Sequence, residues 1–442
     1  MQIAIYPNNY KREEKIRMGL IKKYCGKINK NEFVKNVLIL FSGAVVAQFL
    51  PILFTPVLSR MYNPAAFGIF SVFVGITNIT SQIACLRYDY ALVVAEDDDE
   101  ATKLFLLSSV ITFMFSVITA VIFIPFSSQL SVLFSIKETP QALLLVPLTT
   151  FIISMTSVLN YYNVRFKNYK IITSANIIKS IFAVIIQIVL GLLHFGYWGL
   201  LLGQLISYGF GNTRMLMALK GKIHKEMLDI KILLLVAGKY QNYAKFTVAS
   251  SVANNLTYNL LPSLITGAYS QNHAGYYGMI NRTLGLPLTL ISNTVSQVFM
   301  KQVSDEKTDG EKLATTFKKV SKMLMLISVI PFALLFIFAE PVIPFVLGNE
   351  WAPAAKFLKY LIPLFAVRFV VGPISSSALV MQKQKATMFW QFGLFLCAMI
   401  PSAIKLYFNI PFETYLIILS ILLSVGYLIF YRYCYNMIRK SK

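Results

Sequence analysis

The sequence is poor in the residues on which most soluble enzymes depend. Its 442 residues include 3 His and 4 Cys, and 19 Asp and Glu stand against 41 Lys and Arg. The His and Cys residues lie too far apart to indicate a metal site or a Cys–His nucleophile. A glycine-rich phosphate-binding loop is also missing, which argues against an ATP-driven pump. We therefore expect no metal, no cofactor and no enzymatic activity.

Hydrophobic residues are present in excess. They make up 56% of the chain, and the mean hydropathy is +0.63. These residues form long apolar runs, which are typical of membrane spans. We predict an all-α polytopic membrane protein with about twelve transmembrane helices in two pseudo-symmetric six-helix lobes. The expected spans are 37–58, 65–86, 103–127, 141–163, 171–193, 196–218, 244–267, 273–299, 315–339, 355–381, 386–408 and 412–434.

The basic residues lie mainly on one side of these spans. Five fall in outer loops and three inside spans, so 33 of the 41 lie in inner segments. The positive-inside rule then predicts that both termini are cytoplasmic. The same asymmetry explains the net charge of +22 without nucleic acid, for which no binding motif is present. The basic tail either lies on anionic membrane lipids or is a frayed end.

A weak internal repeat supports the division into two lobes. Residues 58–71 (LSRMYNPAAFGIFS) align without a gap on 265–278 (ITGAYSQNHAGYYG), which matches Gly68 with Gly275. An even number of spans in each half predicts a pseudo-twofold axis along the membrane normal. The expected parts are a cytoplasmic tail (1–36), an N-terminal lobe (37–218), an inter-lobe linker (219–243), a C-terminal lobe (244–435) and a second tail (436–442).

Polar side chains inside the spans predict a cleft between the lobes. In span seven they recur at helical spacing and are interrupted by Pro262. The alternative is that such residues join helices by hydrogen bonds. The candidates for binding a ligand are Gln48, Asn78, Asn255, Asn259 and Asn281.

Three basic residues lie within spans, where a charge is costly. Arg282 and Arg368 are nearly central, whereas Lys179 lies close enough to the cytoplasmic end to snorkel. No acidic residue lies comparably deep, so the cleft should favour an anionic ligand, and Arg matches phosphate oxygens bidentately. The alternative is structural: each cation would cap a broken helix or bond backbone carbonyls.

One acidic stretch, RYDYALVVAEDDDEA (87–101), lies on the basic side of the membrane. Asp97 and Glu100 have the spacing of a capping box at the start of span three. An alternative is a cytoplasmic gate in which acidic and basic residues pair, with Arg87 and Asp89 as its members.

Four stretches of the sequence carry a family resemblance: YNPAAFGIFSVF (62–73), LRYDYALVVAEDDDEA (86–101), INRTLGLPLTLISNTVSQVFMKQVSD (280–305) and LGNEWAPAAKFLKYLIPLF (347–365). Together they resemble the oligosaccharide flippases of O-antigen (lipopolysaccharide) and capsule pathways. The superfamily also contains the lipid II flippase and the multidrug exporters. The resemblance extends from about residue 37 to 435.

The resemblance implies a V-shaped pair of lobes in the bacterial inner membrane. Such a protein turns a polyprenyl-diphosphate-linked oligosaccharide from the inner to the outer leaflet by alternating access. Arg282 falls on the family's cavity arginine before the LPL motif, whereas no motif fixes Arg368 or Lys179. A polysaccharide polymerase and a chain-length regulator are the implied partners. A proton or sodium gradient could drive transport, although facilitated passage is equally compatible. A cation-coupled multidrug exporter of the same fold is the alternative.

Overall fold

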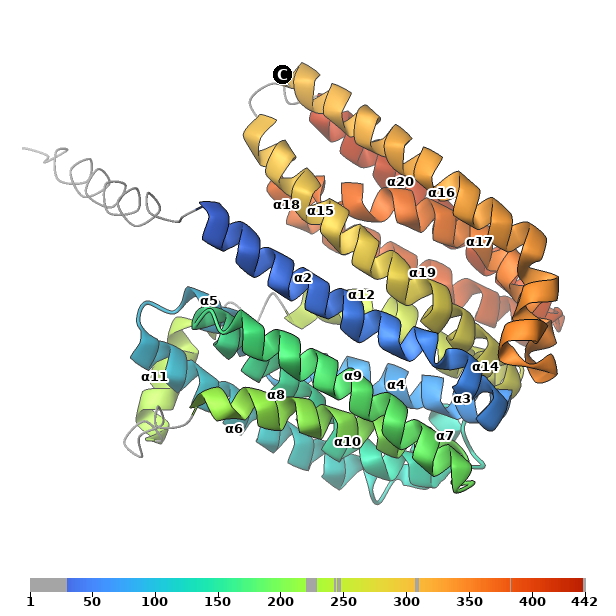
Figure 1. Cartoon of the computed structure of the whole chain (residues 1–442), viewed down its shortest axis with the longest axis horizontal. Helices are drawn as coiled ribbons and strands as arrows, with labels where there is room; N and C mark the ends of the chain where they lie inside the picture. Colours follow the sequence, from blue (N-terminus) through green and yellow to red (C-terminus); the bar gives the residue numbers. More distant parts are fainter. Residues whose placement is uncertain are drawn as a thin grey trace, which may run out of the picture.

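Two groups of helices lie side by side in the computed structural model (Figure 1). It describes residues 30–219, 229–241, 244, 248–306, 310–381 and 383–439, and no strand occurs among them. Residues 1–29 of the expected tail and 220–228 of the expected linker lie outside the described part of the chain. The two groups are the N-terminal lobe, α2 to α10, and the C-terminal lobe, α12 to α20.

The N-terminal lobe contains the first six expected spans. Its elements are α2 (Lys30–Leu53), α3 (Thr55–Met61), α4 (Pro64–Ala84), α5 (Tyr88–Val94), α6 (Asp98–Phe123), α7 (Ser127–Leu133), η1 (Pro140–Leu145), α8 (Val146–Arg165), α9 (Tyr169–Leu192), α10 (Tyr197–Leu216) and η2 (Met217–Leu219). A further helix, α11 (Ile230–Lys239), follows it.

The C-terminal lobe contains the last six expected spans. Its elements are α12 (Val248–Asn259), α13 (Leu261–Ala268), α14 (Gln271–Ile280), the π-helical η5 (Asn281–Gly285), α15 (Leu286–Glu306), α16 (Gly310–Leu347), η6 (Asn349–Trp351), α17 (Ala352–Ile374), α18 (Ser377–Val380), α19 (Gln384–Phe408) and α20 (Phe412–Arg439).

All twelve expected spans coincide with helices, which confirms the predicted fold class. In the described residues, nine helical segments are long and apolar enough to cross a membrane by themselves. Of the other three spans, the sixth is α10, and the seventh and eighth are broken into α12–α13 and α14–η5–α15. The seventh breaks at Pro262, as predicted, because proline lacks the N–H that would continue the ladder.

Carboxylates at the start of α6 hold the linker helix α11 on the N-terminal lobe. The Asp97 side chain accepts the N–H of Glu100 (2.6 Å), which confirms the predicted N-cap. The Glu100 side chain accepts the N–H of Glu96 (2.8 Å), one residue before the N-cap. Glu100 also accepts hydrogen bonds from Lys239, the last residue of α11, and from Tyr240, which follows it. Bonds to Glu100 and Glu96 raise the pKa of Lys239.

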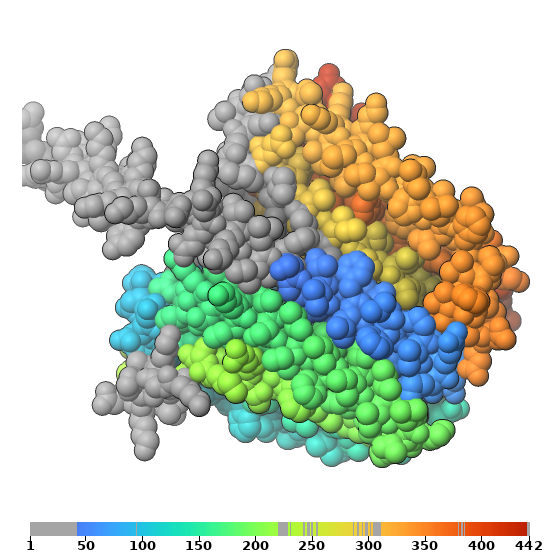
Figure 2. Space-filling view, viewed as in Figure 1, coloured from blue at the N-terminus to red at the C-terminus, as the bar shows by residue number. Residues whose placement is uncertain are grey.

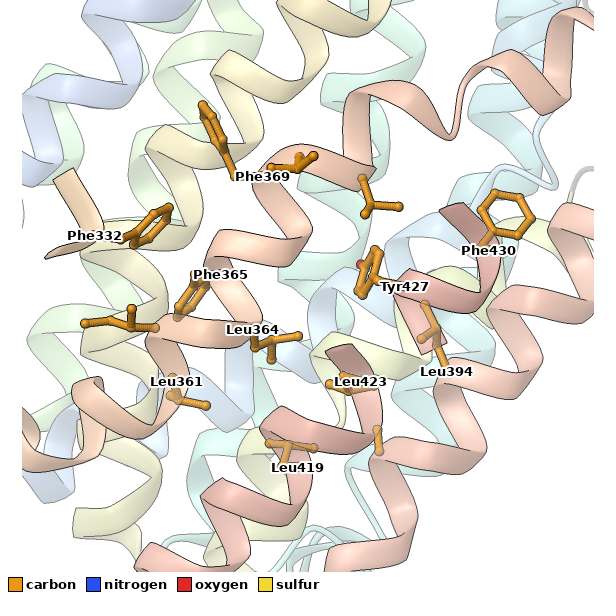
Figure 3. Close-up of a cluster of buried hydrophobic side chains, with 14 of the residues drawn as sticks. Phe332, Leu361, Leu364, Phe365, Phe369, Leu394, Leu419, Leu423, Tyr427 and Phe430 are labelled. Carbon is orange, nitrogen blue, oxygen red and sulfur yellow. The ribbon is translucent and has the colours of Figure 1, made fainter. Parts of the chain in front are cut away.

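Each lobe has its own apolar core. Figure 3 shows the C-terminal core, in which Leu364 of α17 lies near Leu423 of α20. Large apolar side chains also point outward: Ile330 of α16, for example, is 67% exposed. Such faces fit a hydrocarbon surrounding, and a helix suits that surrounding because its backbone hydrogen bonds are satisfied within the segment.

The lobes meet tightly at one end, where α4 packs on α14. A Cβ added at Gly68 would lie 1.9 Å from the backbone oxygen of Gln271, and one at Gly275 would lie 1.9 Å from that of Pro64. The repeat alignment matches Gly68 with Gly275 and also Pro64 with Gln271. The same contact is therefore made twice, as a pseudo-twofold axis requires.

Trp351 of η6 completes this end of the interface. Its indole is fully buried, and Nε1 donates to the backbone oxygen of Ser59 (2.8 Å) in the other lobe. The ring meets Phe67 and Tyr276 edge-on, with centroids 5.3 and 5.9 Å away. We call α3, η6 and the first turns of α4 and α14 the closed end. In Figure 1 it lies opposite α5 and α11.

Candidate functional site

A cavity of about 930 Å³ lies between the lobes, in the middle of the molecule. Its walls come from α2, α4, α9 and α10 on one side and from α12, η5, α15, α17, α19 and α20 on the other. The volume falls within the range of small-molecule sites. Figure 2 shows α2 and α15 meeting across the lobe boundary on one face of the molecule. All eight predicted ligand residues line this cavity: Gln48, Asn78, Lys179, Asn255, Asn259, Asn281, Arg282 and Arg368.

The cavity wall carries positive charge without compensating carboxylates. Lys179, Arg282 and Arg368 line it, whereas no Asp or Glu occurs among the described lining residues. Ion pairs elsewhere in the described chain involve other residues. Arg282 Nε is buried and has no hydrogen-bond partner in this part of the chain. Such a wall suits an anion that supplies hydrogen-bond acceptors.

Arg282 owes its position to the π-helical turn η5. A π-bulge inserts an extra residue into a turn and is frequent at functional sites. The turn leaves room for the Asn281 side chain against Gly285, where an added Cβ would lie 2.3 Å from Asn281 Oδ1. The guanidinium then reaches across the lobe boundary, with Cζ 5.9 Å from the ring centroid of Phe67.

Gly285→Ala should therefore displace the Asn281 side chain and lower stability by about 1 kcal/mol, a cost typical of modest overpacking. In an Asn281→Ala background, Gly285→Ala should leave the stability unchanged. There the clashing Oδ1 is gone, and the remaining Cβ lies 3.9 Å away. Thermal unfolding of the two single variants and the double variant measures the coupling. Additive losses would show that the two side chains do not compete for this space.

Arg368 and Lys179 are held by aromatic rings on separate walls. Arg368 Cζ lies 4.1 Å from the ring centroid of Tyr258 on α12. Lys179 Nζ lies 4.6 Å from that of Tyr208 on α10. A ring face attracts a cation without neutralising it. Both side chains therefore keep their full charge for the cavity.

The amides on α4 and α12 also join the lobes. Asn78 Nδ2 donates to Asn259 Oδ1 (3.1 Å), and Asn259 Nδ2 donates to the backbone oxygen of Asn255 (2.9 Å). Asn255 in turn donates to the backbone oxygen of Ser251 (2.8 Å). These residues therefore join helices as well as lining the cavity. Gln48 differs, because its Oε1 is buried and has no partner in the described structure.

The two predicted gate residues lie elsewhere, at the start of α5, where both are buried. Asp89 is completely buried and accepts a hydrogen bond from Ser157 of α8 (2.6 Å). Arg87 has a left-handed backbone (φ 59°) and lies over the ring of Tyr90, 4.9 Å from its centroid. These contacts stay within the N-terminal lobe, and neither residue lines the cavity. Their gating role remains a prediction.

Sequence reasoning missed the aromatic part of the wall. Tyr208, Trp390 and Tyr427 line the cavity, and so does Gln391. Aromatic residues occur throughout these spans, so nothing in their pattern separates a cavity face from a lipid face. Gln391 carried a usable signal, because it is a polar residue inside expected span eleven.

The fold, two six-helix lobes around a central polar cavity, is one that this chain shares with a multidrug resistance transporter and with a lipid II flippase. The inward-facing conformation of a multidrug resistance MATE family transporter of the MOP superfamily has a TM-score of 0.62, with 15% identity over 92% of this chain and 95% of that one. The lipid II flippase MurJ, in an inward closed conformation, has a TM-score of 0.66, with 16% identity over 91% of this chain and 86% of the MurJ chain.

The particular family follows from the sequence comparison. Residues 57–356 match the family described as "Polysaccharide biosynthesis protein", and the chain belongs to it. The predicted resemblance to the superfamily of flippases and exporters is thereby confirmed. A MOP superfamily transporter from Pyrococcus furiosus, described by the reverse polarity of its binding pocket, also shares the fold (TM-score 0.56, 16% identity, 92% and 96% covered). No curated protein sequence matches the chain significantly.

Proposed function

We propose that this protein turns a polyprenyl-diphosphate-linked oligosaccharide from the inner to the outer leaflet, for O-antigen or capsule synthesis. The observation that carries the proposal is the cavity wall with three basic residues and, among its described members, no acidic one. A diphosphate must lose water to cross the bilayer, and fixed cations replace part of that hydration. The guanidinium of Arg282 offers the planar donors that suit phosphate oxygens.

The proposed mechanism is alternating access, which the division into two lobes supports. In this proposal the protein lies in a bacterial inner membrane with both chain termini in the cytoplasm, the orientation that the positive-inside rule predicts, and the closed end lies at the outer face. The head group then enters from the inner side while its lipid tail stays in the bilayer. Rocking of the lobes separates α4 from α14 and releases the cargo outward, towards a polymerase and a chain-length regulator. The cavity offers no carboxylate for proton or sodium coupling among its described residues, and a product gradient suffices.

The competing function is multidrug export by the same fold. An exporter of cationic drugs needs a deep carboxylate to attract its substrate, and the described cavity wall presents arginine and lysine instead. Drug susceptibility therefore belongs in the same experiment.

Arg282→Ala is expected to block transport in the host. The gene is deleted and restored as wild type, Arg282→Ala, Arg282→Lys or Arg432→Ala, and the lipid-linked oligosaccharide in each leaflet is measured. Loss of a charge-assisted hydrogen bond of about 1.5–3 kcal/mol predicts a rate roughly 10- to 100-fold lower. Arg432, an exposed arginine of α20 outside the cavity, is the matched control.

Accumulation in the inner leaflet with Arg282→Ala, partial recovery with Arg282→Lys and normal transport with Arg432→Ala support the proposal. Normal surface polysaccharide with Arg282→Ala at normal protein levels contradicts it. Unchanged lipid intermediates together with altered drug susceptibility would assign the protein to the exporters.

A further inference from the structure

We propose that a sugar ring of the cargo binds to the wall formed by Trp390 and Gln391 of α19 and Tyr427 of α20. We call these three residues the saccharide wall. The inference rests on the proposed function and adds to it the part of the cavity that recognises the glycan rather than the phosphates. All three residues line the cavity.

The indole of Trp390 is fixed in position before any ligand arrives. Its Nε1 donates to the backbone oxygen of Gly426 (3.1 Å). Phe430 stacks on it with centroids 4.0 Å apart and planes at 5°, and Tyr427 meets it at 80° with centroids 5.3 Å apart. Figure 3 shows Tyr427 and Phe430 one turn apart on α20. A ring held in this way loses little conformational freedom on binding.

The chemistry of this wall suits a sugar. A pyranose has a face of C–H groups that packs on an aromatic surface, and its hydroxyl groups lie around the rim. Gln391, the next residue of α19, also lines the cavity, and its Oε1 is buried and lacks a hydrogen-bond donor in the described structure. A phosphate, which is ionised at neutral pH, cannot supply that donor, whereas a hydroxyl can. Gln48 Oε1 on the opposite lobe has the same need.

The wall is also continuous with the cationic part of the cavity. The hydroxyl groups of Tyr427 and Tyr258 are hydrogen-bonded to each other. Arg368 Cζ lies 4.1 Å from the ring centroid of Tyr258. Trp390, Tyr427, Tyr258 and Arg368 thus form one contiguous series. This order matches a glycosyl diphosphate, in which the first sugar is joined directly to the phosphates.

Binding of two probes tests the inference. One is the lipid-linked oligosaccharide extracted from a strain that lacks this transporter, and the other is polyprenyl diphosphate without sugar. Affinities are measured for the full chain in nanodiscs, as wild type and as variants. The variants are Trp390→Ala, Gln391→Met, Phe389→Ala and Arg282→Gln. Phe389 precedes the wall, is 69% exposed and does not line the cavity, so its variant controls for loss of an aromatic side chain on α19.

We expect wild type and Phe389→Ala to bind the glycosylated probe about tenfold more tightly than the bare diphosphate, a factor typical of one aromatic contact. Trp390→Ala and Gln391→Met should lose that advantage and keep their affinity for the bare diphosphate. Gln391→Met nearly conserves volume, so it reports on binding if Trp390→Ala fails to fold.

Retention of the tenfold advantage by Gln391→Met and by folded Trp390→Ala would overturn the saccharide wall, as would equal affinity of wild type for the two probes. Arg282→Gln separates this failure from failure of the proposed function. If Arg282→Gln weakens both probes while the wall variants change neither, the wall alone is wrong. If wild type binds neither probe, or Arg282→Gln binds both normally, the proposed function fails and the wall with it.

Discussion

Gly68→Leu is expected to abolish transport while leaving the protein folded. A Cβ at Gly68 would already lie 1.9 Å from a backbone oxygen of Gln271, and backbone cannot turn aside as a side chain can. The larger side chain therefore pushes α14 away and holds the closed end apart. Because both lobes keep their own cores, the lobes separate rather than unfold. We expect transport to fall at least about a hundredfold, as loss of several kcal/mol of interface packing predicts.

Thiol labelling measures where the lobes have separated. A cysteine at Asn293, which lines the cavity, is introduced after the four native cysteines are replaced. A membrane-impermeant reagent added outside should label it faster with Gly68→Leu or Gly275→Leu than with the native glycines. Gly209→Leu is the matched control, since nothing lies within 4 Å of a Cβ there. Normal transport with Gly68→Leu, or unchanged outside labelling, would show that this contact does not close the protein.

Trp351→Ala is expected to lower stability by about 3–5 kcal/mol, the usual loss for a fully buried tryptophan. The variant removes the packing on Phe67 and Tyr276 as well as the hydrogen bond to Ser59. Trp351→Phe keeps most of the packing but loses the hydrogen bond to Ser59. Loss of that hydrogen bond should lower stability by about 1 kcal/mol, in addition to the loss caused by the smaller ring. Thermal unfolding in detergent measures both losses.

Outside labelling shows whether Trp351 acts on the lobe contact or only on folding. Since Trp351 bridges the lobes, its removal should also raise outside labelling at the Asn293 position. Trp198 stacks on Tyr197 within the N-terminal lobe, so Trp198→Ala should lower stability without that increase in labelling. Equal labelling of the Trp351 and Trp198 variants would mean that Trp351 contributes to general stability and not to the lobe contact.

Much of the fold was predictable because hydropathy and charge act locally. Apolar runs located the twelve spans, Pro262 located the break in span seven, and Asp97 located the start of α6. The π-helical turn at Arg282 was not predictable, because a change of helical register depends on what packs against the turn. Gly68 and Gly275 were noticed as a repeated pair, but their role required the distance between two backbones.

In the candidate site, too, features encoded locally were predictable and features that depend on packing between helices were not. A charged residue within an apolar run can be recognised from the sequence alone. Arg282, Arg368 and Lys179 were selected in this way, and all three line the cavity. The partnership of Asn78 with Asn259 joins residues from different lobes, and periodicity within a helix contains no such information. Trp390 was missed because its distinguishing features are its neighbours, Phe430 and Gly426, on another helix.

The doubled contact between α4 and α14 bears on the origin of the molecule. A surface that meets an equivalent surface through the same residues twice is what two identical subunits form around a twofold axis. Each half crosses the membrane an even number of times, so two copies could be fused head to tail without inverting either one. The single chain therefore keeps the geometry of a homodimer of six-helix subunits. The two halves nevertheless differ in sequence: Trp351 and Trp390 both lie in the C-terminal half.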